Sequence, residues 1–254
     1  MNKKDDVKTL IKSLKDYYDA SSIPVYIPTL QEEVPFKVLT IKEHRDLFDS
    51  VNDEAGIEVV INSFNDLILN CCSKEHSTLL TVLDRSLILL SLRSHLFGPS
   101  IKAQDDNEKV HTINIQEHID KCTKSSIPDG LLKYDIAYGA FSVSCSIPSL
   151  VRDKSTNSQL SNRIKKDDTK TLGHLFIYEL IKYINTITFN DETFTFADLS
   201  IHQQIQICEL LPISISSKLT TYINSIKIFE DSYLKISDNL TLSLDSILLD
   251  AENA

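Results

Sequence analysis

Residues 79–99 read LLTVLDRSLILLSLRSHLFGP, and this stretch decides the fold. Apolar side chains fall on most sides of a helix drawn from about Leu79 to Leu96, which is typical of a helix buried at the centre of a lobe. Gly98-Pro99 then ends it, because glycine adopts the left-handed conformation and proline cannot continue the hydrogen-bond ladder. We therefore expect the first half of the chain to pack around this helix.

Upstream of the central helix, the sequence predicts one helix, two strands and two further helices. Apolar residues at spacings of three and four indicate an amphipathic helix from about Asp5 to Asp19. Residues 25–27 and 34–38 are typical of extended segments. Residues 40–43 (TIKE) have the spacing of a capping box, so a helix should begin there. Another apolar stripe runs from Ile57 to Ile68.

Downstream, the period changes towards two over residues 100–145, which indicates short strands. Residues 152–170 are polar and basic, and we interpret them as a linker or a loosely packed excursion. Helical spacing returns over residues 172–184, and residues 186–196 predict a hairpin around Asn190-Asp191. Two more helices are expected over residues 201–226.

These patterns predict a helix-dominated α+β protein. Residues 1–150 form a helical lobe with short antiparallel strands, residues 151–170 a basic linker, and residues 171–254 a second helical lobe with an acidic tail.

Composition excludes several classes of function. The 254 residues are 42% apolar and 24% charged, which matches a folded globular protein rather than a disordered one. The formal net charge of −10 repels phosphate backbones and anionic lipid, so we expect neither nucleic acid nor membrane as a partner. The charged start of the chain, MNKKDDV, is unlike a secretory signal.

Cysteine usage indicates a reducing compartment. The five cysteines are odd in number and irregularly spaced, which does not suggest a disulfide framework. Cys71-Cys72 with His76 could ligate a metal, but adjacent cysteines seldom point at one ion, and a second pair at zinc-finger spacing is missing. We predict no metal site.

Candidate catalytic groups each have a structural interpretation beside the chemical one. His118 and Cys122 would share a helix face, as a nucleophile and its base do, but also as half-buried residues do. The doublets Glu32-Glu33, Asp105-Asp106 and Asp167-Asp168 lie in polar sequence, where carboxylates are solvated. The basic residues 163–166 lack interleaved aromatics. Nucleotide, hydrolase and zincin motifs are absent from the sequence, so we predict no catalytic or cofactor-binding residue.

Several segments resemble the baseplate hub family of T-even-like contractile-tailed bacteriophages. They are residues 23–30 (IPVYIPTL), 34–43 (VPFKVLTIKE), 83–85 (LDR), 92–99 (LRSHLFGP), 183–187 (YINTI) and 210–212 (LLP). The resemblance covers roughly Val25 to Phe229, and the basic stretch 152–170 does not follow the family's pattern. It brings no catalytic residues with it.

The resemblance implies a non-enzymatic protein that helps to build the central hub of the baseplate, with other hub proteins as partners. Two forms of this role are open: a permanent virion component, or a transient assembly chaperone that leaves before completion. A cell-wall hydrolase with a concealed site is the alternative from another class. We expect the protein in the host cytoplasm during assembly and, as a component, in the virion tail baseplate; the oligomeric state is left open.

The acidic tail carries the predicted partner-binding residues. These are Leu240, Leu242 and Leu244, which alternate, followed by Ile247 and Leu248. An alternating segment can add a strand to the sheet edge of a partner. The alternative is that the tail packs on the chain's own second lobe.

Overall fold

The computed structural model describes residues 3–50, 57–105, 107–164 and 171–249. Its helices are α1 (Lys3–Ala20), α2 (Ile41–Ser50), α3 (Ile57–Cys71), α4 (Lys74–Ser77), α5 (Val82–Phe97), α6 (Ile115–Cys122), α7 (Asp129–Leu132), α8 (Leu150–Ile164), α9 (Thr171–Tyr183), α10 (Ile201–Leu210), α11 (Ile213–Ser232) and α12 (Leu244–Leu249), with a 3-10 turn η1 (Phe196–Asp198). Its strands are β1 (Ser22–Ile27), β2 (Glu32–Lys37), β3 (Ser100–Gln104), β4 (Val110–Asn114), β5 (Lys133–Tyr138), β6 (Phe141–Ser146), β7 (Ile184–Phe189), β8 (Glu192–Thr195), β9 (Lys235–Ser237) and β10 (Leu240–Thr241).

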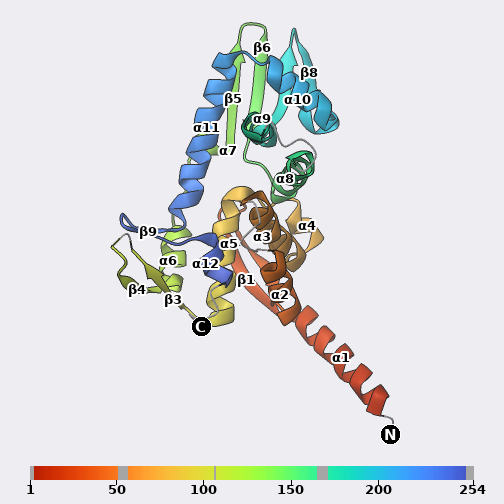
Figure 1. Ribbon diagram of the computed structural model, residues 1–254, viewed down its shortest axis with the longest axis vertical. Coiled ribbons are helices and arrows are strands. Elements are labelled where there is room, and N and C mark those ends of the chain that lie inside the picture. Colours follow the sequence, from red (N-terminus) through yellow and green to blue (C-terminus); the bar gives the residue numbers. More distant parts are fainter. Residues whose placement is uncertain (1–2, 51–56, 106, 165–170, 250–254) are drawn as a thin grey trace.

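The molecule is elongated, with two parts stacked along its long axis (Figure 1). The lower part holds α1 to α6, the hairpins β1-β2 and β3-β4, and α12. The upper part holds an antiparallel sheet in the order β5-β6-β7-β8, together with α9, α10 and most of α11. The predicted helix-dominated α+β class is confirmed.

Helix α5 lies at the centre of the lower part, as its all-round apolarity predicts. Every residue from Val82 to Arg93 is buried, and the helix contacts β1, α3, α6, α8, α11 and α12. It begins later than predicted because Asp84 forms a capping box with Thr81, whose amide donates to the Asp84 Oδ2 at 2.8 Å. Gly98 ends it with a φ of 89°.

Other local predictions are also confirmed. The two extended segments form the β1-β2 hairpin. The amide of Thr40 donates to the Glu43 carboxylate at 2.6 Å at the start of α2. Residues Asn190 and Asp191 turn the β7-β8 hairpin with positive φ angles of 48° and 68°.

The predicted linker over residues 151–170 is wrong for its first part, which forms α8. The helix packs between α3 and α9, and its buried face includes the polar residues Asp153, Thr156 and Asn157 beside Leu150 and Leu160. A helix whose buried face is largely polar lacks the apolar stripe that sequence patterns detect. Residues 165–170 lie outside the described residues.

The predicted boundary between two lobes also needs correction. Strand β6, which precedes residue 150, pairs with β7, which follows residue 171, so one sheet spans the expected linker. The chain then returns through α11 to the lower part, where α12 packs on α5. The second lobe is therefore completed by strands from the first half of the sequence.

Shortening a buried side chain of the central helix α5 should destabilise the whole fold. Replacing the buried Leu87 by alanine removes apolar contacts and leaves a cavity, so we expect a loss of about 2–5 kcal/mol in the free energy of unfolding. Leu210→Ala is the matched control, because Leu210 is exposed. Chemical denaturation of both variants measures the difference; equal, small losses would contradict the central position of α5.

Candidate functional site: a charged cleft and an exposed helix face

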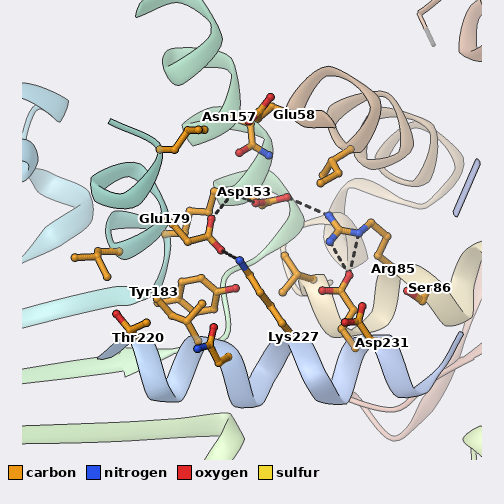
Figure 2. A pocket seen from close by; sticks show the side chains of 18 of the residues that line it. Glu58, Arg85, Ser86, Asp153, Asn157, Glu179, Tyr183, Thr220, Lys227 and Asp231 are labelled. Carbon is orange, nitrogen blue, oxygen red and sulfur yellow. Dashed lines mark hydrogen bonds and ion pairs between the residues drawn. The ribbon is translucent and has the colours of Figure 1, made fainter. Parts of the chain in front are cut away.

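A cleft of about 620 Å³ opens between α3, α5, α8, α9 and α11. Figure 2 shows charged side chains from several of these helices converging in it. Apolar residues such as Ile61, Leu180 and Ile223 line it between the charges. We call this the charged cleft.

Asp153 of α8 lies at the centre of the charged cleft. Its Oδ2 is 3.1 Å from the Arg85 Nη1 of α5, and its Oδ1 is 2.9 Å from the Lys182 Nζ of α9. Asn65 of α3 donates to the same carboxylate at 2.9 Å and accepts from Arg85 at 3.2 Å. One carboxylate thus joins four helices.

Two further ion pairs extend the network to α11. The Arg85 Nη2 lies 2.6 Å from the Glu230 Oε1, and Lys227 lies 2.8 Å from the Glu179 Oε1. Glu179 also pairs with Lys182 at 3.0 Å. The ion network therefore comprises Arg85, Asp153, Glu179, Lys182, Lys227 and Glu230, with Asn65 as a neutral bridge.

The electrostatics of the network favour the charged forms at its centre. Burial opposes ionisation, but Lys182 and Arg85 outweigh it and lower the pKa of Asp153. The pKa of Glu179 is lowered in the same way, against burial, by Lys182 and Lys227. The pKa of Lys182 is raised by Asp153 and Glu179, again against burial. Burial raises the pKa of Glu230 despite its contact with Arg85.

This chemistry is suited to holding helices together. A general acid or base needs a pKa near neutrality, whereas Asp153 and Glu179 are held ionised by their cations. Two polar groups that line the charged cleft, the Ser86 hydroxyl and the Asn157 amide nitrogen, are buried without a hydrogen-bond partner among the described residues. Sequence patterns missed the network because its members are distributed over five helices, with two each on α9 and α11.

The second feature is an apolar stripe along α1. It consists of Val7, Leu10, Ile11, Leu14, Tyr17 and Tyr18, whose exposed fractions range from 37% to 67%. The amphipathic helix is as predicted, but in the described part of the chain its apolar face stays largely exposed. Figure 1 shows α1 projecting from the lower part, and its contact with the body is to β2. We call this surface the α1 stripe.

The tail residues predicted to bind a partner lie inside the molecule. Leu240, Leu242, Ile247 and Leu248 are buried and Leu244 is half-buried. Helix α12 packs on α5, and the amide of Leu242 donates to the carbonyl of Leu234 at 2.9 Å. These side chains are therefore not available to a partner in this conformation. The alternative of packing on the second lobe is also corrected, because the tail covers the central helix of the lower part.

His118 and Cys122 do share a face of α6, with the Cys122 Sγ 3.5 Å from the His118 Nε2. That nitrogen is also 2.7 Å from the carbonyl oxygen of Tyr233, to which it donates. Burial raises the pKa of Cys122 to about 11, so the thiol is protonated at neutral pH. The imidazole of His118 donates to a carbonyl and the thiol of Cys122 stays protonated. We therefore interpret this pair as a structural contact.

The remaining candidates stay apart or lie in solvent. Cys71 and Cys72 are buried, while His76 faces Glu32 at 3.9 Å. Asp105 pairs with His111 at 2.8 Å in an exposed hairpin, and Asp106 lies outside the described residues. The doublet at 167–168 and residues 165–166 of the basic stretch lie outside them as well.

The described residues contain neither a metal-binding cluster nor a helix that could span a membrane. In the described ranges, three or more His, Cys, Asp or Glu side chains nowhere gather closely enough to hold a metal ion. Within that same part of the chain, none of the helices combines the length and apolarity that crossing a membrane requires.

Removing the central charge should cost stability in a pH-dependent way. Asp153→Asn removes the shared anion of Arg85 and Lys182, which keep Glu230 and Glu179 as partners, so we expect a loss of about 1.5–3 kcal/mol at neutral pH. A lowered pKa means that the contribution of Asp153 is present above its ordinary value of 3.8 and is lost as the pH falls below it. The difference between wild type and variant should therefore narrow in acid.

Denaturation at several pH values measures this difference, with Asp238→Asn as control because Asp238 pairs with Lys235 in solvent. If wild type and Asp153→Asn differ in free energy of unfolding by the same amount in acid and at neutral pH, the stabilising role of the Asp153 charge is contradicted.

Comparison with known proteins places the chain in a family. Residues 21–234 match the model of a family described as T4 bacteriophage base plate protein. No curated protein and no solved structure gives a significant match. The matched range contains the whole ion network and begins directly after α1. Because the match spans most of the chain, this protein belongs to the T4 bacteriophage base plate protein family.

Proposed function

We propose that this base plate protein is a non-enzymatic subunit of the baseplate hub that acts in assembly through contacts with other hub proteins, and that the α1 stripe makes one of these contacts. The observation that carries the proposal is the exposure of six apolar side chains on one face of a projecting helix. Contiguous apolar surface of this kind marks a protein interaction site.

The energetics of an isolated helix support this role. Helices of this length are marginal in water unless an apolar face is buried, and the described residues leave the stripe of α1 exposed. Val7, Leu10, Leu14 and Tyr17 follow the alternating three and four spacing of a coiled-coil seam. Ile11 and Tyr18 widen that seam to one side, which fits a groove between helices better than a single partner helix.

Charge indicates what kind of groove fits. Residues 7–18 carry three lysines and one aspartate, whereas the whole chain has a net charge of −10. Lys8 and Lys15 are exposed beside the stripe. We therefore propose an acidic, apolar groove on a neighbouring hub protein as the partner surface.

The non-enzymatic part of the proposal is supported by the chemistry of the candidate groups. Asp153 and Glu179 are held ionised in ion pairs, and the Cys122 thiol is protonated.

A transient assembly chaperone is the second form of the same role, since an exposed stripe serves either one. Quantitative mass spectrometry of purified virions separates them: a fixed ratio to known tail proteins indicates a component, and presence only in lysate indicates a chaperone.

Replacing two apolar side chains of the α1 stripe by alanine should release the protein from its assembly partners. We expect Leu10→Ala with Leu14→Ala to weaken co-purification with tail intermediates by about tenfold or more, because two apolar anchors are lost while helix propensity is kept. The matched control is Lys12→Ala with Asp16→Ala, which changes the opposite face of α1 without changing net charge.

Affinity purification from infected cells, quantified by mass spectrometry, compares the two double variants. Equal recovery of tail proteins with both variants would exclude the α1 stripe as the contact. Absence of tail proteins from the wild-type preparation would exclude the hub role altogether.

A further inference from the structure

Strand β8 leaves one side of the four-stranded sheet open. The sheet runs in the order β5-β6-β7-β8, so β5 and β8 are its edges. Helix α11 packs against β5, where Tyr222 stacks on Tyr134 with ring centroids 5.1 Å apart. Beyond β8, the described residues provide no further strand, and all four residues of β8 are exposed. Figure 1 places β8 at the margin of the upper part.

The backbone of β8 presents its hydrogen-bonding groups to this open side. The positive φ angles at Asn190-Asp191 are those of a two-residue type I′ turn. In such a hairpin the flanking residues Phe189 and Glu192 form a hydrogen-bonded pair, and the pairs alternate along the ladder. Thr193 and Thr195 therefore fall in the non-hydrogen-bonded pairs with β7. Both amides and the Thr193 carbonyl point outward, whereas the Thr195 carbonyl, as the N-cap of η1, already accepts the first hydrogen bond of that turn.

An apolar row of the sheet also ends at β8. Ile136, Val143, Ile187 and Phe194 stand side by side on consecutive strands. The first three are 2%, 0% and 5% exposed, whereas Phe194 is 46% exposed. The cover over this row thus stops at the last strand, where one further apolar side chain would continue it.

The strand β8 is short and carries one charged residue, Glu192, but three common blocks of a sheet edge are missing from it. Edge strands of soluble proteins are commonly blocked by proline, by lysine or by a bulge. The sequence Glu-Thr-Phe-Thr contains neither residue, and its pairing with β7 is regular. An unblocked edge of this kind is a template for a further strand.

We propose that β8 pairs antiparallel with β8 of a second copy of this chain, about a two-fold axis at Phe194. The segment Thr193-Phe194-Thr195 reads the same in both directions, so the symmetric register places Phe194 against Phe194 of the second copy. Each Thr193 then lies opposite a Thr195, and these are the residues whose backbone groups point outward. The register therefore pairs the open groups of Thr193 with Thr195 of the second copy, whose carbonyl accepts there with its second lone pair, and it extends the apolar row across the axis.

Charge favours a second copy over an unrelated strand. Two chains of net charge −10 repel one another, so a contact between copies requires a surface without acidic residues. Residues 193–195 are uncharged, and the single acid of β8, Glu192, falls opposite position 196, which is Phe196. The interface is small, so we expect a dimer that forms with rising concentration. This contact is independent of the α1 stripe.

Charge complementation at the two-fold axis tests the proposal. In sedimentation velocity of the full chain, we expect Phe194→Lys and Phe194→Glu each to weaken self-association by about tenfold or more, because like charges face each other across the axis. An equimolar mixture of the two variants should associate again. Tyr138→Lys is the control, since Tyr138 is an exposed aromatic on the opposite edge strand.

A cysteine at the axis tests the register directly. Non-hydrogen-bonded pairs bring α-carbons to about 4.5 Å, within disulfide range, so Phe194→Cys should oxidise to a covalent dimer while Tyr138→Cys should not. The native cysteines in the described residues are buried and reduced. Wild type that remains monomeric at its highest soluble concentration, or a dimer that Phe194→Lys leaves intact, would overturn the proposal.

Discussion

Asp153 is the group on which the arrangement of the molecule depends. It lies on α8, where the two parts of the chain meet, and its carboxylate is shared by Arg85 from the lower part and Lys182 from the upper part. A buried charge without a partner is far more costly than an unmade apolar contact. Moving either part would break the contact of Asp153 with Arg85 or with Lys182, so the ion network favours one placement of the parts. The apolar core around α5 supplies the driving force, and the network selects the geometry.

This division of roles bears on function. An elongated body whose two parts are fixed can present distant surfaces at a constant separation. The α1 stripe lies at one end of the molecule and the open edge of β8 lies in the upper part at the other (Figure 1). The family match covers the body but not α1. A proposed helix contact at one end and a proposed strand contact at the other would let one subunit join neighbours within a baseplate.

Sequence patterns predicted those elements whose signals are local. The capping box at Thr40, the turn at Asn190-Asp191 and the buried helix α5 follow from short-range chemistry, and all three are present. Helix α8 was missed because its buried face is polar, and only the tertiary partners of Asp153 explain why those residues can be buried. The alternating leucines of the tail indicate that the segment is buried, but they do not indicate which surface covers it. For this reason the sequence assigned the tail to a partner. The ion network as a whole was not predicted, since Arg85, Asp153 and Glu230 lie far apart in sequence and only the Glu179–Lys182 pair is local.

We expect helix α1 to become ordered against a partner in the assembly. Hydrogen–deuterium exchange of the backbone amides of α1 tests this claim, comparing the free chain with the chain in purified tail intermediates. In the free chain α1 should exchange quickly, because its apolar face is exposed and its helix is marginal alone. In the assembly, slow exchange over residues 7–18 is predicted, while α5 remains protected in both states. Exchange in α1 that is equally fast in both preparations would contradict the account.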